Sequence, residues 1–457
     1  MAEWAVLRWL LPLALLQGLL YIIVVPPWEH YDEPGHFVYA AEIAAGELHE
    51  RGPAAVAISR EVADSMVRHG FLNGQFRPDL IAPGVIRVAE NQRVHPPLYY
   101  ALIALPLRLV RFLSVETQLY TARTVSLLLY ALTIVTAWRI AVVVVPDEPL
   151  VQRLFPLLVL LVPSFADLMT AVNNDVLLNF AVTAALLGAV LLIRDGLRPL
   201  PATLALLGLA VAVAAKRTGL AAAIPVGLAF VWSLHRRAIS LRLVLAGLAL
   251  LIVLAVAALR LVQLSGPEGP YLVLETRPWL DTLDRLYLRL NIAAWLRSAS
   301  DLAASIGPYQ ALAVVGFTSF WARLSWGNVA LPPLWDWLFA GLCLAAVIGL
   351  IAGVPRWRQL SLAQRRSLWL FVTAVLAGAL ALVARLHPLP PPPIDAYIPR
   401  GRYMFWAMVP TIWLLALGVL QLVPARWRSL GLWGLVVLLA VCNLTALATL
   451  ASAYQLS

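Results

Sequence analysis

Most of this sequence consists of apolar runs of about 20 residues, separated by shorter polar segments. A helix needs about 20 apolar residues to cross a bilayer. Hydrophobic residues make up 61% of the chain and charged residues only 13%, and the mean hydropathy is +0.83. A water-soluble domain has a far more polar composition. We therefore expect an all-α polytopic membrane protein, built as a single integral-membrane domain over residues 1–457.

Eleven runs are candidate membrane spans. They are 7–25, 119–138, 151–171, 175–193, 200–215, 218–233, 241–263, 334–353, 368–386, 403–422 and 430–450. The first run has an arginine flank and no small-residue cleavage site, so we expect it to be a retained span. Another apolar stretch, 98–113, is short and contains Pro106 and Arg108.

Arginine clusters predict the orientation of the spans. Short loops rich in Lys and Arg stay in the cytoplasm, which places 26–118 and 264–333 outside as the two large external segments. This count requires that 98–113 lies at the membrane surface without crossing, so the first external loop carries juxtamembrane helices. The clusters are Arg194/Arg198, Arg236/Arg237/Arg242, Arg356/Arg358/Arg365/Arg366 and Arg426/Arg428.

The net charge of +10 belongs mainly to these cytoplasmic loops, so we expect membrane lipids and no nucleic acid as partners. Cys343 and Cys442 both lie inside apolar runs, which excludes a disulfide framework.

The first span leads directly into the acidic segment around Asp32 and Glu33. A carboxylate pair at the bilayer surface is well placed to supply a general base. The alternative is a solvated loop start in which the two carboxylates only mark the water boundary. Neighbouring side chains of an extended segment point opposite ways, so only one of the pair should be critical.

Three further polar groups share the external side. Asn174 and Asp175 open a span, where they serve equally as a helix N-cap. Lys216, the only lysine in the sequence, precedes Arg217; this pair indicates either phosphate binding or a structural ion pair. The last group stands at the mouth of a late span, where snorkelling to water is the alternative. It comprises Arg400, Arg402 and Tyr403.

Two regions of 264–333 are also informative. Residues 281–297 have the pattern of an interfacial amphipathic helix. The aromatic side chains within and just after 308–333 indicate an interfacial belt, or a wall against a sugar ring or prenyl chain.

Together, these groups predict an external site with carboxylates on one side and cations on the other. There a carboxylate would accept a proton while cations stabilise a phosphate leaving group. No cofactor is expected with certainty. His30 and His36 beside Asp32 leave a divalent metal open, although their spacing fits no standard metal-binding pattern.

The order of several short motifs resembles the GT-C superfamily of integral-membrane glycosyltransferases. The resemblance covers about 26–404 and is nearest to protein O-mannosyltransferases, lipid A aminoarabinose transferases and an uncharacterised bacterial membrane family. The motifs are the Asp32–Phe37 segment, the segment from His95 to Tyr100, Asn174-Asp175, Lys216–Gly219, Ser319–Trp321 and Gly401–Tyr403.

The resemblance implies a polyprenyl-phosphate sugar donor and transfer with inversion, with Asp32, adjacent to Glu33, as the base. His95 belongs to one of the motifs and is a candidate substrate-binding residue. The chain lacks the large C-terminal periplasmic domain of better-known relatives, so the acceptor is left open. We expect a glycosyltransferase at the external face of a bacterial cytoplasmic membrane. The alternatives are a transporter or flippase of a lipid-linked or anionic substrate, and a non-catalytic scaffold.

Overall fold

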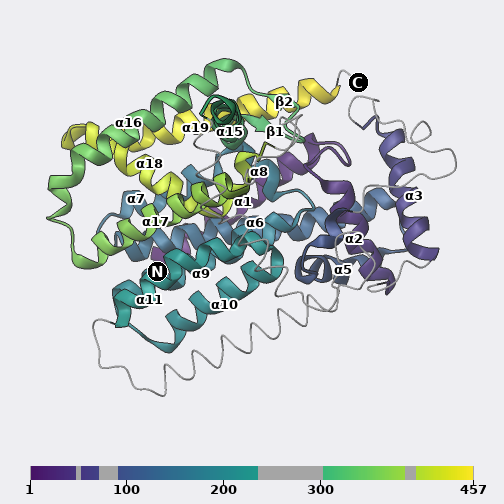
Figure 1. Ribbon diagram of the computed structural model, residues 1–457, viewed down its shortest axis with the longest axis horizontal. Coiled ribbons are helices and arrows are strands. Elements are labelled where there is room, and N and C mark those ends of the chain that lie inside the picture. The colour runs from purple at the N-terminus through teal and green to yellow at the C-terminus, as the bar shows by residue number, and fades with distance from the viewer. Residues whose placement is uncertain (1, 48–52, 72–90, 235–301, 386–397, 456–457) are drawn as a thin grey trace.

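The computed structural model describes residues 2–47, 53–71, 91–234, 302–385 and 398–455. Almost all of this part is helical; a small antiparallel hairpin pairs β1 (Arg323–Leu324) with β2 (Val329–Ala330). The long helices lie side by side in one bundle (Figure 1). The prediction of an all-α polytopic membrane protein is therefore confirmed.

Eight helices of the described part are long and apolar enough to cross a membrane, counting each short 3-10 turn with the helix that it leads into. They are α1 (Ala2–Val24), α6 (Val115–Val144), α9 (Asn174–Asp195), η2 (Arg217–Ala222) with α11 (Ala223–Leu234), α16 (Pro333–Trp357), α17 (Leu362–Arg385), η4 (Gly401–Ala407) with α18 (Met408–Leu422), and η5 (Ala425–Trp427) with α19 (Arg428–Gln455).

Two more of the expected spans have a different form. The run 151–171 is a pair of helices, α7 (Pro149–Leu160) and α8 (Pro163–Met169), bent by 69° at their junction. The residue before a proline is disfavoured in helical conformation, and Val162 before Pro163 is extended. The run 200–215 is the 17-residue helix α10 (Pro199–Ala215). The eleventh expected span, 241–263, lies outside the described residues.

Three short helices, α2 (Glu33–Ala45), α3 (Pro53–Arg68) and α5 (Leu98–Val110), gather at the end of the bundle that the sequence places outside (Figure 1, right), and a fourth, η1 (Asn91–Val94), packs against α2. Thirteen residues make α5 about 20 Å long, which is shorter than a bilayer core. It packs against α2 and α6.

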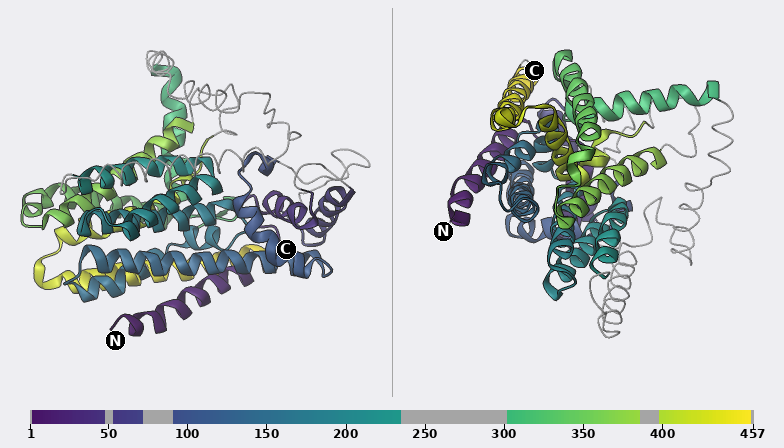
Figure 2. Two further views of the ribbon diagram at one scale, coloured as in Figure 1. Left: turned by 90° about the horizontal axis from the view of Figure 1, so that it is seen from below. Right: turned by 90° about the vertical axis from the view of Figure 1, so that its left-hand side faces the viewer.

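Residues 302–321 of the second external segment form the apolar helix α15 (Leu302–Trp321), which the sequence analysis did not expect. Figure 1 shows α15 end-on, whereas the long helices lie in the plane of the view; Figure 2 shows it projecting from the bundle. The amphipathic helix expected at 281–297 lies outside the described residues.

The parallel helices α16 and α18 touch through their backbones. A Cβ atom on Gly349 would meet the carbonyl oxygen of Gly418, and one on Gly418 would meet the carbonyl of Ala346. Small residues allow such close approach of membrane helices. β2 lies just before α16 and η4 just before α18, so this contact sets how closely the two helices that follow these segments approach each other.

Candidate functional site

The first external loop is held in a strained conformation. Within the described residues, three non-glycine residues have positive φ: Trp28 (76°), Asp32 (58°) and Ser325 (55°). Such conformations cost of order 1–3 kcal/mol each and persist only where the surroundings enforce them. All three lie at the end of the bundle that the sequence places outside, two of them within the loop that leads into α2.

Asp32 occupies the position before the first residue of α2. Its carboxylate accepts a hydrogen bond of 2.6 Å from Nη2 of Arg402, and 24% of its side chain is exposed. The Arg402 guanidinium also lies 3.5 Å from the ring centroid of Tyr31. The loop carboxylate and the late-span arginine, 370 residues apart in sequence, are therefore direct partners.

Glu33 has a different environment. Its carboxylate forms two hydrogen bonds with Arg123, of 2.6 and 2.9 Å, and neither side chain is exposed. It also accepts from the backbone N–H groups of Trp28 and Val172. Burial would raise the pKa of Glu33, but the charge and hydrogen bonds of Arg123 outweigh it and hold the pKa below its usual value. With both oxygens engaged and no access to solvent, Glu33 anchors the loop.

The segment from Asn173 to Asp175 provides both the helix N-cap and the partner for Lys216 that the sequence suggested. Asn173 caps α9 by accepting a hydrogen bond from the Asp175 N–H at 2.9 Å, and Asn174 donates to the carbonyl of Ala215. The Asp175 carboxylate receives Nζ of Lys216 at 2.6 Å, with both side chains buried. The structural ion pair considered for Lys216 is therefore present. Arg217, its neighbour, is exposed.

Tyr403 lies among three cations. Its ring centroid is 3.8 Å from the guanidinium of Arg385 and 5.2 Å from both Arg402 and Nζ of Lys216. The side chain of Arg402 is only 9% exposed, so it does not snorkel to water. The ring joins the Lys216–Asp175 pair to the Arg402–Asp32 pair in one continuous cluster.

A layer of aromatic and imidazole rings borders this cluster. His36 Nδ1 lies 2.8 Å from the Tyr100 hydroxyl, and its ring stacks on His95 with 6.2 Å between centroids. Burial, followed by the charge of Lys216, lowers the pKa of His95 to about 3; burial and the charge of His95 hold the pKa of His36 well below its ordinary value. Both rings are therefore neutral at pH 7 and act only as neutral hydrogen-bonding groups.

A pocket opens beside Asp32. Its empty volume is about 340 Å³, part of it open to the outside. The lining combines side chains of the first loop, α8, the β hairpin and the start of η4, among them Tyr31, Asp167, Arg323, Ser325, Arg400 and Arg402. Arg323 is paired with Asp336 at 3.2 Å. In the described part of the chain, no carboxylate pairs with Arg400.

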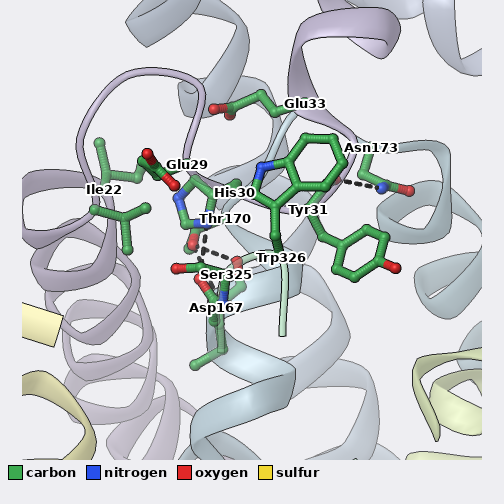
Figure 3. A network of polar contacts seen from close by, with 12 residues as sticks. Ile22, Glu29, His30, Tyr31, Glu33, Asp167, Thr170, Asn173, Ser325 and Trp326 are labelled. Carbon is green, nitrogen blue, oxygen red and sulfur yellow. Dashed lines mark hydrogen bonds and ion pairs between the residues drawn. The ribbon is translucent and has the colours of Figure 1, made fainter. Parts of the chain in front are cut away.

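The sequence analysis missed Asp167, which joins three segments in Figure 3. Its two oxygens accept from the Ser325 N–H at 2.6 Å and lie 2.8 Å from Nδ1 of His30. The indole of Trp326 then donates to the carbonyl of Trp28 at 3.1 Å. The signal was present, because an ionisable residue within an apolar run is a candidate functional residue.

Two of the sequence motifs meet beneath the pocket. The Gly401 N–H donates to Oγ of Ser319 at 2.8 Å, and a Cβ on Gly401 would overlap the backbone of Gly316 and Phe320. Only glycine permits this approach, which fixes the position of the adjacent Arg402. The motifs at 319–321 and 401–403 are therefore parts of one contact.

The histidines considered as metal ligands have protein partners. His30 is held by Asp167 and His36 by Tyr100. No group of three His, Cys, Asp or Glu side chains suited to a metal ion occurs among the residues that the structure describes.

Comparison with known proteins leaves the family open: no protein-family model matches the chain, and no curated protein matches it.

Proposed function

We propose that this protein is a GT-C-type glycosyltransferase that transfers a sugar from a polyprenyl-phosphate donor at the external face of a bacterial cytoplasmic membrane. The observation that carries the proposal is the position of Asp32. It is a strained, partly exposed carboxylate beside a pocket whose lining includes Arg400 and Arg402. A base next to a phosphate-binding group is what transfer from a sugar phosphate requires.

In this reaction the carboxylate of Asp32 accepts the proton of the acceptor hydroxyl. The acceptor oxygen forms a bond to the anomeric carbon, and the bond between that carbon and the phosphate oxygen breaks. The electron pair leaves with the phosphate, which departs as polyprenyl phosphate. Attack from the side opposite to the leaving group inverts the anomeric centre.

Which cation binds the donor phosphate is inferred from the carboxylates that already pair with each of them. Lys216 is already neutralised by Asp175, whereas Arg400 has no carboxylate partner in the described part of the chain. An arginine fork binds phosphate through paired hydrogen bonds. We therefore assign the donor phosphate to Arg400 and Arg402, and give Lys216 a supporting role in holding Tyr403.

Sugar transfer by isolated membranes tests the proposal. Membranes containing the protein supply the acceptor, and a polyprenyl-phosphate hexose labelled in the sugar is added. Asp32→Asn should lower transfer by about two to four orders of magnitude, the usual contribution of general-base catalysis. Asparagine also tolerates the left-handed backbone conformation at this position. Glu61→Gln, which removes an exposed external carboxylate on α3, is the matched control.

Transfer at the parent rate by the Asp32→Asn variant would contradict the proposal. Movement of the intact labelled lipid across vesicles, with no cleavage of the sugar–phosphate bond by either protein, would instead favour a flippase.

A further inference from the structure

Arg402 uses only part of its hydrogen-bonding capacity on Asp32. Its Nη2 donates to the carboxylate at 2.6 Å. Its Nε and Nη1 are buried, and neither has a hydrogen-bond partner among the described residues. A guanidinium offers five N–H donors in a rigid fork, and buried donors without partners are unfavourable. The Arg402 side chain is 91% buried, since 9% is exposed, and it lines the pocket.

The neighbouring groups of the pocket direct a ligand toward Arg402. Asp167 is occupied by His30 and by the Ser325 N–H, and Arg323 by Asp336. Arg400 lines the same pocket, with no carboxylate paired to it in the part of the chain that the structure describes. The available positive charge is therefore concentrated at Arg400 and on the unused side of Arg402, which suits an oxyanion such as a phosphate ester.

We propose that a phosphate bound in this pocket competes with Asp32 for Arg402, so that the carboxylate is free to reach the acceptor hydroxyl only once the donor is bound. This inference rests on the proposed function for the identity of the base. While Nη2 of Arg402 donates to the Asp32 carboxylate, that carboxylate is held by the guanidinium and is not free to turn toward an acceptor hydroxyl. A phosphate on the same guanidinium takes over its hydrogen bonds, and the carboxylate is released toward the acceptor hydroxyl.

The coupling is reciprocal, because a ligand that weakens the Arg402–Asp32 pair must itself bind more weakly while that pair exists. Removing the charge of Asp32 should therefore tighten phosphate binding. We expect Asp32→Asn to lower the dissociation constant by about 5- to 150-fold, the range usual for coupled sites. Simple loss of a carboxylate elsewhere on the external face should have no such effect.

The test measures binding of inorganic phosphate and of farnesyl phosphate to the purified full-length chain by isothermal titration calorimetry. Comparison of the two ligands identifies a lipid or a free phosphate as the source. Asp32→Asn should increase the affinity for whichever of the two ligands binds more tightly to the parent protein. Glu61→Gln should leave this affinity unchanged, and Arg400→Gln should lower it. Size-exclusion profiles confirm that each variant is folded.

A double variant separates competition from general repulsion. In an Arg402→Gln background, Asp32→Asn should no longer tighten binding. Equal tightening with and without Arg402, no tightening in the single variant, or no phosphate binding by the parent would each overturn the inference. Binding requires no sugar transfer, so tightening without transferase activity would refute the proposed function alone, and Asp32-dependent transfer without tightening would refute the coupling alone.

Discussion

Glu33→Gln should destabilise the protein strongly. The substitution leaves the Arg123 guanidinium without its counter-ion at a position where neither side chain is exposed. Removing one partner of a buried ion pair costs about 3–5 kcal/mol. Because 1.4 kcal/mol corresponds to a factor of ten, the unfolded fraction should rise by about two to four orders of magnitude.

The free energy of unfolding can be measured by titrating the detergent-purified protein with SDS and following tryptophan fluorescence. Asp32→Asn is the control in the adjacent position. It should cost much less, because the side chain is partly exposed and asparagine keeps an acceptor for Arg402. The double variant Glu33→Gln/Arg123→Gln should cost less than the sum of the two single changes, as expected for residues in contact.

Two results would refute this reasoning. One is a Glu33→Gln protein as stable as the parent, and the other is an Asp32→Asn protein destabilised by the same amount as Glu33→Gln. Either would mean that the two neighbouring carboxylates do not have the separate environments described above.

Two further predictions concern the other charged and titratable groups of the site. Lys216→Ala should lower the free energy of unfolding by about 3–5 kcal/mol, because it leaves Asp175 as a buried unpaired carboxylate. Adding Asp175→Asn to this variant should restore part of the lost stability. A Lys216→Ala protein as stable as the parent in an unfolding titration would contradict the prediction. Because the pKa of His95 is about 3 in the folded state and near 6.5 when unfolded, the unfolded state binds more protons between these values. Stability should therefore fall as the pH drops from about 6.5 toward 3, by at most about 1.4 kcal/mol per pH unit for this group. His95→Gln should reduce that loss in thermal unfolding at pH 5 and 7.5, and an unchanged loss would contradict the prediction.

The membrane spans could be predicted well because their signal is local. A run of about 20 apolar residues is sufficient to specify a crossing helix, and ten of the eleven expected runs coincide with described helices or helix pairs. The bend between α7 and α8 was not predicted, although Pro163 marks it. The 20-residue helix α15 was missed because its apolar run follows a more polar stretch and was assigned with it to an external segment.

The sequence predicted most of the charged residues that form the site, but it did not predict which of them pair with each other. The order and sidedness of the motifs placed Asp32 and Arg402 at the same end of the molecule. The different environments of Asp32 and Glu33 depend on Arg123, which lies 90 residues from Glu33 and inside an expected span. No local pattern specifies which carboxylate a distant arginine will bind. Arg123 and Asp167 were nevertheless detectable as charges within apolar runs.

The glycine contact between α16 and α18 is the point about which the crossing angle of these two helices can change. Gly349 lies 16 residues beyond the start of α16, and Gly418 lies 16 residues beyond Arg402, so each arm is about 24 Å long at 1.5 Å per residue. Ser325 and Gly327 precede the first arm, and Arg400 and Arg402 are at the start of the second; all four line the pocket. At this crossing no side chain separates the two backbones, so the helices cannot approach more closely and a relative motion there is a change of crossing angle. A change of about 5° in the crossing angle would displace the two rims by about 2 Å, enough to admit or exclude one layer of atoms at the opening.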